Sequence, residues 1–224
     1  MDESAEGAPI GRRVVLGLLG LGAIGVVTGS TIQGWLSNLQ VRDPTGLTSQ
    51  IPLGNTWRYY SVTGAVTPRD PASYALKVSG LVDNPTTYSY ADLEALPQTS
   101  FTDTFQCVTG WRVPDVPWSG VRVAELLERA APAAGAVGVR YLSFDGAYSV
   151  NMTLEQARAD DVIVALTMYG TPVTHDHGGP VRIYSGSMYG YKGTKWLSEI
   201  VVTPDNEPGY WEARGYPLDG IISE

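Results

Sequence analysis

Short strand-like runs, separated by turn-forming residues, dominate the chain from residue 57 onward and restrict the folds open to it. Aromatic and β-branched residues are frequent in these runs, as is typical of strands. Glycine (26) and proline (15) are plentiful, so the individual elements are expected to be short. The predicted strands are 57–64, 74–82, 99–107, 139–146, 162–169, 180–184 and 195–203.

A few short helical patterns interrupt the predicted strands. Residues 90–97 are expected to form a helix that Pro97 ends. The clearest helical pattern is 119–132, with Ser119 as the expected N-cap. Residues 153–161 begin with the capping-box pattern of Thr153 and Gln156. Short strands mixed with short helices predict an α+β domain.

The composition is that of an ordered protein that does not bind nucleic acid. Hydrophobic residues make up 43% and charged residues 17% of the chain, which excludes an intrinsically disordered protein. The net charge of −8 argues against a nucleic-acid partner. From residue 57 onward, neither glycine-rich fingerprint of nucleotide-binding loops occurs. Any anionic ligand must therefore be held by a local cluster of basic groups.

An uncharged run at 14–36 follows the polar segment 1–13, which ends in Arg12 and Arg13. Its 23 residues would reach ~35 Å as a helix, enough to span a bilayer. The paired arginines favour a cytoplasmic N-terminus and resemble a twin-arginine export signal. A buried core helix is the alternative interpretation of this run.

A single-pass membrane anchor is the preferred interpretation, because no small-residue cleavage pattern of a signal peptide is evident. A cleaved export signal is the alternative. Residues 37–56 are rich in turn formers and predict a linker. Residues 57–224 would then form one domain on the extracytoplasmic side, either periplasmic or extracellular.

Cys107 is the only cysteine of the chain, and it lies among tryptophans, glycines and prolines in "TFQCVTGWRVPDVPWSG". A lone thiol forms no internal disulfide. Three interpretations remain open from the residues alone: a buried small hydrophobic side chain, a nucleophile that needs a nearby base, or a ligand of a soft metal.

The two histidines, His175 and His177, lie in "VTHDHGGPVRIY". Together with Cys107 and Met188 they are the ligand types of a blue-copper site. The spacing argues against copper, because Cys107 precedes His175 by 68 residues. A zinc site would lack evident third and fourth ligands. Simple hydrogen bonding within the loop is the alternative.

The stretch 178–197 carries Arg182, Lys192 and Lys195 and no acidic residue. Its glycines allow the backbone to approach a ligand closely, and successive N–H groups beside basic side chains can hold a phosphate. Tyr189 and Tyr191 are candidates to line the same pocket. A solvated basic loop is the alternative interpretation.

Three segments, in this order, carry a resemblance to a known family: "FQCVTGWRVPDVPWSGVRVAELL", "HGGPVRIYSGSMYGYKGTKWLSEI" and "PGYWEARGY". Residues 54–216 resemble the oxidoreductase molybdopterin-binding domain of sulfite oxidases and periplasmic methionine sulfoxide reductases. The resemblance implies mixed β-sheets with short helices, a molybdenum-molybdopterin cofactor and two-electron oxygen-atom transfer.

The resemblance assigns roles to particular residues. Cys107 matches the cysteine that binds molybdenum, and Arg182 matches an arginine that pairs with the pterin phosphate. The positions matching cofactor contacts of the family are Asn55, Arg58, Tyr59, Cys107, Ser143, Asp145, His177, Arg182, Lys192, Gly193, Thr194 and Lys195.

The segment after the cysteine departs from the sulfite oxidases, which place arginines there to bind sulfite. In "CVTGW" the nearest arginine is Arg112, at a different position. Arg112 and Tyr189 are the candidate catalytic residues beside Cys107, and the substrate is expected to be a small molecule.

No haem-attachment motif occurs in the sequence, so the resemblance implies a separate electron-transfer partner, such as a membrane cytochrome or a quinone-linked protein. Two alternatives have other functions. One is a thiol-based reductase or transferase that uses Cys107. The other is a non-catalytic docking or structural subunit of a redox complex that keeps the fold.

Overall fold

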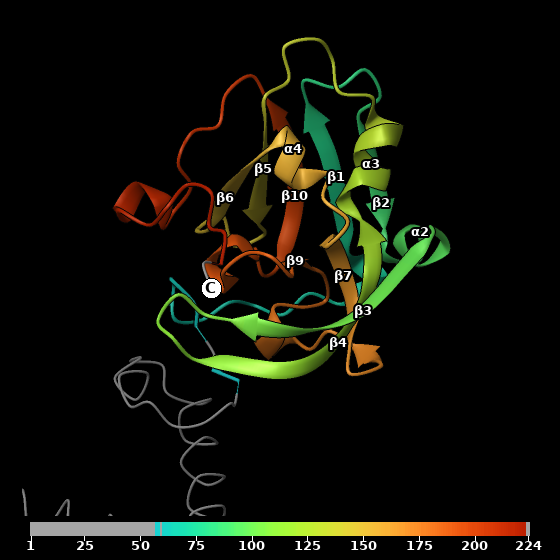
Figure 1. Cartoon of the computed structure of the whole chain (residues 1–224). Coiled ribbons are helices and arrows are strands. Elements are labelled where there is room, and N and C mark those ends of the chain that lie inside the picture. Colours follow the sequence, from blue (N-terminus) through green and yellow to red (C-terminus); the bar gives the residue numbers. More distant parts are fainter. Residues whose placement is uncertain (1–56, 59, 223–224) are drawn as a thin grey trace, which may run out of the picture.

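The computed structural model describes residues 57, 58 and 60–222 (Figure 1). The expectations for 1–13, 14–36 and 37–56 lie outside this part of the chain. Within it, no helix has the length and apolar character needed to cross a membrane.

Two five-stranded sheets form the framework of the domain. The first sheet has the order β2 (Thr86–Ser89), β1 (Ala75–Gly80), β10 (Leu197–Thr203), β5 (Gly138–Ser143) and β6 (Ser149–Thr153). β1 and β10 are parallel, whereas the other pairs of this sheet are antiparallel. The first sheet is therefore mixed, as expected.

The second sheet is antiparallel and contains a long curved ribbon (Figure 1). Its path is β3 (Gln98–Gln106), β4 (Arg112–Arg122), β7 (Val162–Met168) and β8 (Thr171–Pro172), and β9 (Arg182–Ser185) also pairs with β7.

The helices are short: α2 (Tyr90–Ala95), α3 (Val123–Ala130) and α4 (Leu154–Ala157). Single 3₁₀ turns complete the described elements: η2 (Pro71–Ser73), η3 (His175–His177), η4 (Gly190–Lys192) and η5 (Glu212–Arg214). Among the described residues, an α+β architecture with mixed strands is confirmed.

Strand β7 separates two hydrophobic clusters because its side chains alternate between its two faces. Val162 and Val164 pack into the larger cluster, which lies between the first sheet and α3. Ile163 and Ala165 face a smaller, aromatic cluster that contains Phe105. The functional site borders this second cluster.

The helix expected at 119–132 begins later than the sequence pattern suggests. Residues 119–122 belong to β4. Residues 119–121 pair with both β3 and β7, and Arg122, which pairs with β7, is the N-cap of α3. A Cβ at Gly120 would lie 2.0 Å from the carbonyl oxygen of Val164, so the strands meet closely there. The prediction of Ser119 as the N-cap was wrong, because pairing on both edges outweighs local helix propensity.

The capping box of Thr153 and Gln156 is confirmed. The hydroxyl of Thr153 accepts a hydrogen bond from the Gln156 amide at 3.1 Å. Gln156 Oε1 in turn accepts from the Thr153 amide at 3.0 Å. The helix α4 that follows is only one turn long.

The strand expected at 57–64 is wrong for the residues described there, which form no strand. Trp57 instead packs against Phe105, with ring centroids 4.7 Å apart, and against His177 at 4.9 Å. Aromatic packing, rather than sheet pairing, therefore holds this segment beside the second cluster.

Candidate functional site

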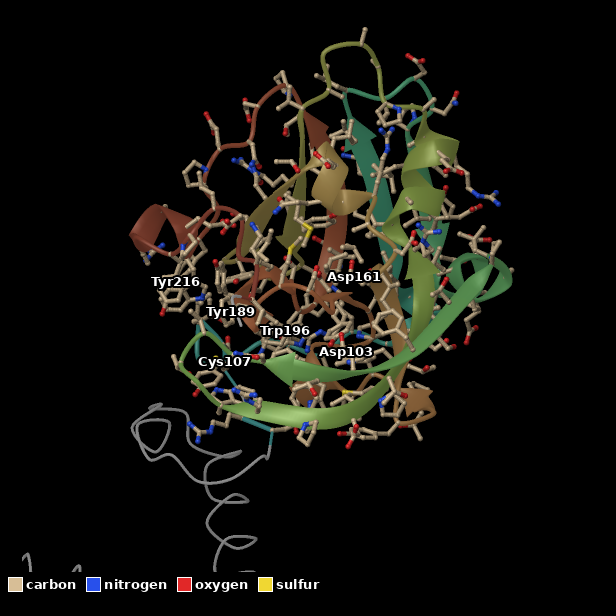
Figure 2. The ribbon with its side chains drawn as sticks, in the orientation of Figure 1. Asp103, Cys107, Asp161, Tyr189, Trp196 and Tyr216 are labelled. Carbon is tan, nitrogen blue, oxygen red and sulfur yellow. The ribbon has the colours of Figure 1, made fainter. Side chains whose placement is uncertain are left out.

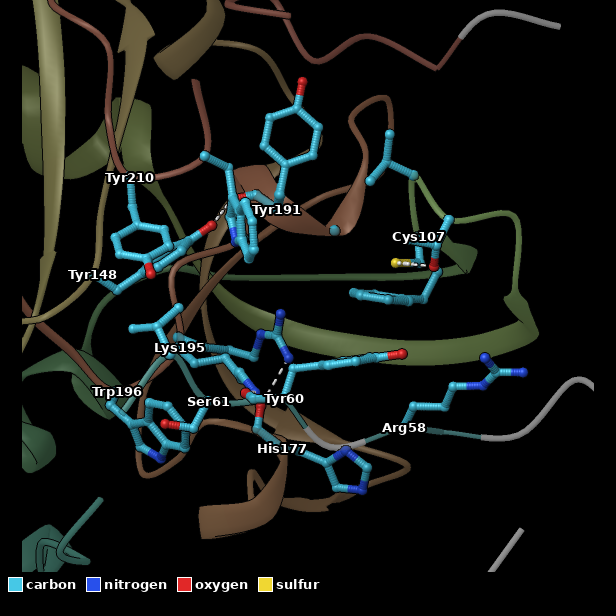
Figure 3. Close-up of a pocket in the computed structure, with 18 of the residues that line it drawn as sticks. Arg58, Tyr60, Ser61, Cys107, Tyr148, His177, Tyr191, Lys195, Trp196 and Tyr210 are labelled. Atoms are coloured by element: carbon cyan, nitrogen blue, oxygen red, sulfur yellow. Dashed lines mark hydrogen bonds between the residues drawn. The ribbon is translucent and has the colours of Figure 1, made fainter. Parts of the chain in front are cut away.

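A cavity of about 480 Å³ lies beside the aromatic cluster, where several loops meet (Figure 3). Its walls come from the segment after Trp57, the turn between β3 and β4, the turn η3, the turn η4 and the C-terminal segment 209–216. Residues distant in sequence therefore share one pocket.

Cys107 lies in the turn between β3 and β4, and its half-buried side chain lines the cavity. The Cys107 amide donates to the carbonyl of Trp111 at 2.9 Å, and the Gly110 amide donates to the carbonyl of Cys107 at 3.0 Å. Gly110 has a φ of +94°, which favours glycine. This turn holds the sulfur at the cavity wall, so Cys107 is not simply a core residue.

The surroundings of Cys107 provide neither a base nor a complete metal site. Within the described residues, the hydrogen bond of its sulfur goes to Thr109 and not to a histidine. No group of three or more histidine, cysteine, aspartate or glutamate side chains gathers there to hold a metal. The thiol therefore suits a metal whose other ligands come from a bound cofactor.

Arg182, the first residue of β9, places a cation at the cavity wall with only 3% of its surface exposed. Its Nη1 donates to the carbonyl of His177 at 2.8 Å, and its Nε donates to the carbonyl of Ile183 at 3.3 Å. Burial lowers its pKa to about 10. Among the described residues it forms no ion pair with a carboxylate.

Lys195 adds a second cation to the same cavity. Burial, and then the nearby charge of Arg182, lower its pKa to about 7. Its Nζ donates to the carbonyl of Tyr60 and lies 4.7 Å from the Trp196 ring centroid. Figure 3 shows Lys195 and the Cys107 sulfur on different sides of this cavity. Two desolvated cations near each other favour an anionic ligand.

His177 lines the cavity as a neutral imidazole at pH 7, because burial and the charge of Arg182 lower its pKa to about 4. His175 packs against Trp196 instead, with ring centroids 5.5 Å apart. Met188 is buried in the larger hydrophobic cluster. The candidate copper ligands are thus not gathered in one site.

Glycines allow the turn after β9 to approach the cavity closely. A Cβ at Gly193 would lie 2.9 Å from the carbonyl oxygen of Ile183 and 3.0 Å from Nη2 of Arg182. A Cβ at Gly190 would lie 2.3 Å from the ring of Phe105. Gly193 therefore brings backbone against the guanidinium, as a phosphate-binding turn requires.

Lys192 was expected at the cofactor, but its side chain is directed elsewhere and is absent from the cavity lining that the structure describes. Its fully buried Nζ contacts Glu212 Oε1 at 2.6 Å and the carbonyl of Leu218 at 2.7 Å. It also donates to the carbonyl of Asn151. Three acceptors satisfy the ammonium, so this side chain is not available to a cofactor.

The two candidate catalytic residues besides Cys107 also lie off the described cavity wall. Arg112 is exposed at the start of β4. Tyr189 stacks on Tyr191 with ring centroids 6.4 Å apart, and Tyr191 takes the place on the wall. Figure 2 labels Tyr189, together with Cys107 and Tyr216, in a view of the whole domain.

Of the remaining expected contacts, Arg58 and Asp145 line the cavity. Ser143 is buried behind the wall and donates to the carboxylate of Asp145, so it positions that side chain rather than reaching a ligand. Thr194 is buried off the wall, and its hydroxyl has no hydrogen-bond partner within the described residues. Asn55 and Tyr59 lie outside the described residues.

Sequence reasoning missed most of an aromatic wall formed by Tyr148, Tyr191, Tyr210, Trp211 and Tyr216. Tyr191 and Trp211 each lie 5.2 Å from the Tyr216 ring, and Tyr148 lies 5.7 Å from Tyr210. The segment "PGYWEARGY" contains three of these residues, and its aromatic content was the available signal.

Comparison with known proteins identifies the family. Residues 63–211 match the model of the oxidoreductase molybdopterin binding domain. The uncharacterized oxidoreductase YuiH of Bacillus subtilis is 35% identical, over 67% of this chain and 76% of the relative.

Two relatives with named activities are more distant. The sulfite oxidase of Arabidopsis thaliana is 28% identical, over 65% of this chain and 46% of that protein. The methionine-sulfoxide reductase catalytic subunit MsrP of Ralstonia nicotianae is also 28% identical, over 63% of this chain and 50% of that protein. The chain thus spans about half the length of these two relatives.

The sulfane dehydrogenase SoxCD from Paracoccus pantotrophus has a similar fold, with a TM-score of 0.58 and 19% identity. The match covers 62% of this chain and 40% of that one.

The cavity fits the molybdenum-molybdopterin cofactor of this family. Cys107 offers one soft sulfur ligand, and the described residues hold no group of three or more His, Cys, Asp or Glu side chains that would bind a metal by themselves. Arg182 is a buried cation without a carboxylate partner in the described residues, which suits the phosphate of a pterin. Thus the sulfur donor and the anion-binding groups share one cavity.

Proposed function

We propose that this chain, which belongs to the oxidoreductase molybdopterin-binding domain family, transfers an oxygen atom to or from a small sulfur-containing substrate. It is a molybdopterin-dependent oxidoreductase. The observation that carries the proposal is a single thiol, Cys107, in the same cavity as the buried Arg182, which has no carboxylate partner among the described residues.

The protein's residues hold and orient the cofactor. Cys107 binds the metal as a thiolate, since a coordinated thiol is deprotonated. Arg182 and Lys195 neutralise the phosphate, and Gly193 lets the backbone approach it. His177 offers a neutral imidazole to a polar group of the pterin. The bound cofactor supplies the two-electron redox chemistry.

An uncharged sulfoxide or thioether is the substrate that the wall around Cys107 suits best. Phe105, Val108 and Trp111 line the cavity next to it, and Tyr191 and Tyr216 line it from other segments. Arg112, the candidate for binding sulfite, is exposed and outside the lining, and Arg58 is the arginine of the lining that lies over the Trp111 ring, 5.7 Å from its centroid. An apolar, aromatic surface binds an uncharged group with less desolvation cost than an anion.

The domain is further proposed to be held at a membrane, on the extracytoplasmic side, and to exchange electrons with a separate membrane partner. The uncharged run 14–36 and the preceding Arg12 and Arg13 support the anchor.

Metal and pterin analysis of natively purified protein tests the function, with Cys107→Ser as the matched variant. The expected result is stoichiometric molybdenum and pterin in the wild type and loss of most of the molybdenum in Cys107→Ser. A folded wild-type protein without either component, from a host that makes the cofactor, would refute the proposal. Alkylation-sensitive activity without metal would then identify a thiol enzyme, and no activity would favour a docking subunit.

Steady-state assays of the loaded protein test the substrate class. Methyl sulfoxides and their thioethers are compared with sulfite, using a dye as the electron donor or acceptor. We expect a higher kcat/KM for the uncharged compounds. A preference for sulfite would contradict the proposed substrate while leaving the cofactor assignment intact.

A further inference from the structure

The turn that presents Cys107 also places a hydroxyl against its sulfur. Thr109 Oγ1 lies 3.2 Å from Cys107 Sγ, and both residues line the cavity. Figure 3 shows this contact as a dashed line at the yellow sulfur atom. We propose that Thr109 is a positioning residue, whose hydroxyl donates to the Cys107 sulfur and raises the reduction potential of the metal bound there. This inference rests on the proposed role of Cys107 as the metal ligand.

The direction of the hydrogen bond follows from the chemistry of the ligand. In a free thiol either atom can be the donor. A metal-bound thiol has lost its proton, so Cys107 Sγ can only accept. The hydroxyl of Thr109 is then the donor, and within the described residues it is the one side-chain partner of this sulfur.

The local backbone keeps the hydroxyl in place. The Gly110 amide bonds to the Cys107 carbonyl and the Cys107 amide to the Trp111 carbonyl, which closes the turn on both sides of Thr109. Threonine is β-branched and has few accessible rotamers, so little entropy is lost in holding Oγ1 near the sulfur. Valine at this position would keep the shape of the side chain and remove only the donor.

A hydrogen bond to a coordinating sulfur withdraws electron density from it. The thiolate then donates less charge to the metal, which stabilises the reduced state and raises the reduction potential. Thr109 thus adjusts the driving force for electron exchange without touching the substrate's reacting atom. The neighbouring aromatic residues Phe105 and Trp111 offer no comparable donor to the sulfur within the described contacts.

The test is a redox titration of the loaded protein, followed through the Mo(V) electron paramagnetic resonance signal. The variants are Thr109→Val, Thr109→Ser and the matched control Thr102→Val, which makes the same chemical change on an exposed position of β3. Molybdenum content is measured for each. We expect Thr109→Val to shift the midpoint potential downward, beyond the scatter of replicate titrations. Thr109→Ser and Thr102→Val should titrate as the wild type does.

Each other outcome has a distinct meaning. An unchanged potential in a fully loaded Thr109→Val protein overturns the inference and leaves the proposed function intact. An equal shift in Thr109→Ser shows that packing, not the hydroxyl, is responsible, and also overturns it. So does a Thr109→Val protein that fails to load while Thr109→Ser loads. If Cys107→Ser keeps its molybdenum, the ligand assignment fails, and the inference fails with it.

Discussion

Lys192 and Lys195 lie three positions apart in one turn, and both were expected to reach the cofactor, yet the structure gives them opposite environments. Lys192 is fully buried against the carboxylate of Glu212 and two carbonyls. Lys195 faces the cavity, close enough to Arg182 for that charge to lower its pKa. The first lysine is held in a buried ion pair, whereas the second faces a cavity that it shares with Arg182, Asp145 and Asp176.

The difference teaches how to separate a structural cation from a ligand-binding one. Burial alone does not distinguish them, because burial lowers the pKa of both lysines. Their neighbours distinguish them: Glu212 raises the pKa of Lys192 again, whereas the charge of Arg182 lowers that of Lys195 further and Asp176 and Asp145 raise it by less. A cavity that holds two desolvated cations favours an anionic ligand.

The largest expected effect is on stability, in Lys192→Met. The change leaves the Glu212 carboxylate buried without its partner, which costs about 3–5 kcal/mol of unfolding free energy. Glu212 is the first residue of η5 and directly follows Trp211, which lines the cavity. Loss of the ion pair should therefore also loosen the aromatic wall. Chemical denaturation of the cofactor-free protein measures the loss. A variant as stable as the wild type would show that the pair is not the main anchor of this segment.

The charge-swapped variant Lys192→Glu with Glu212→Lys sharpens this prediction. It restores the ion pair but not the stability, because a glutamate at 192 cannot donate to the carbonyls of Asn151 and Leu218. Full recovery of stability in the double variant would mean that the ion pair alone matters.

Arg182→Met should affect cofactor retention strongly and the stability of the cofactor-free protein only weakly. Retention of the cofactor should fall about 10- to 100-fold, since hydrogen bonds to charged groups contribute about 1.5–3 kcal/mol each. The stability of the cofactor-free protein should fall much less than in Lys192→Met, because the change removes a desolvated cation that has no carboxylate partner in the described residues. Molybdenum content after dialysis, together with denaturation, separates the two effects. Arg182→Lys is the matched control that keeps the charge.

A further expected effect is a pH dependence caused by Lys195. Its pKa is about 7 in the folded cofactor-free protein, against 10.5 ordinarily. Between these pH values the unfolded chain binds a proton that the folded chain lacks. The free energy of unfolding therefore increases as the pH rises from about 7 to about 10.5. Lys195→Met should remove this contribution. A bound anionic cofactor should keep Lys195 protonated and so suppress this pH dependence of stability. Equal pH profiles of stability in the loaded and cofactor-free proteins would contradict the role of Lys195 in binding an anion.

The sequence was informative about the cavity wherever a role depends on a short segment. Cys107, His177, Arg182 and Lys195 were all identified from motifs, and the structure brings them to one cavity. Lys192 was misplaced because its partner, Glu212, is 20 residues further along the chain. No local pattern reveals such a contact, so the same residue type in the same turn received the wrong role.

The fold shows the same division between local and distant interactions. The capping box at Thr153 needs only neighbouring residues and was predicted correctly. Residues 119–122 look helical by themselves, yet they extend β4 because β3 and β7 pair with them from both sides. The segment after Trp57 has strand-forming residues but packs by its rings. In each failure a tertiary contact outweighed a local preference.

The position of β10 in the first sheet has a consequence for the order of events during synthesis. β10 is the second-to-last element made, yet it is the central strand, pairing with β1 about 120 residues earlier and with β5. The sheet cannot close until the ribosome has passed residue 203, and the aromatic wall emerges later still. Pairings so distant in sequence form slowly. The cavity is therefore completed only after residue 216 has been made, so a cofactor can be enclosed only once every segment that lines the cavity has emerged.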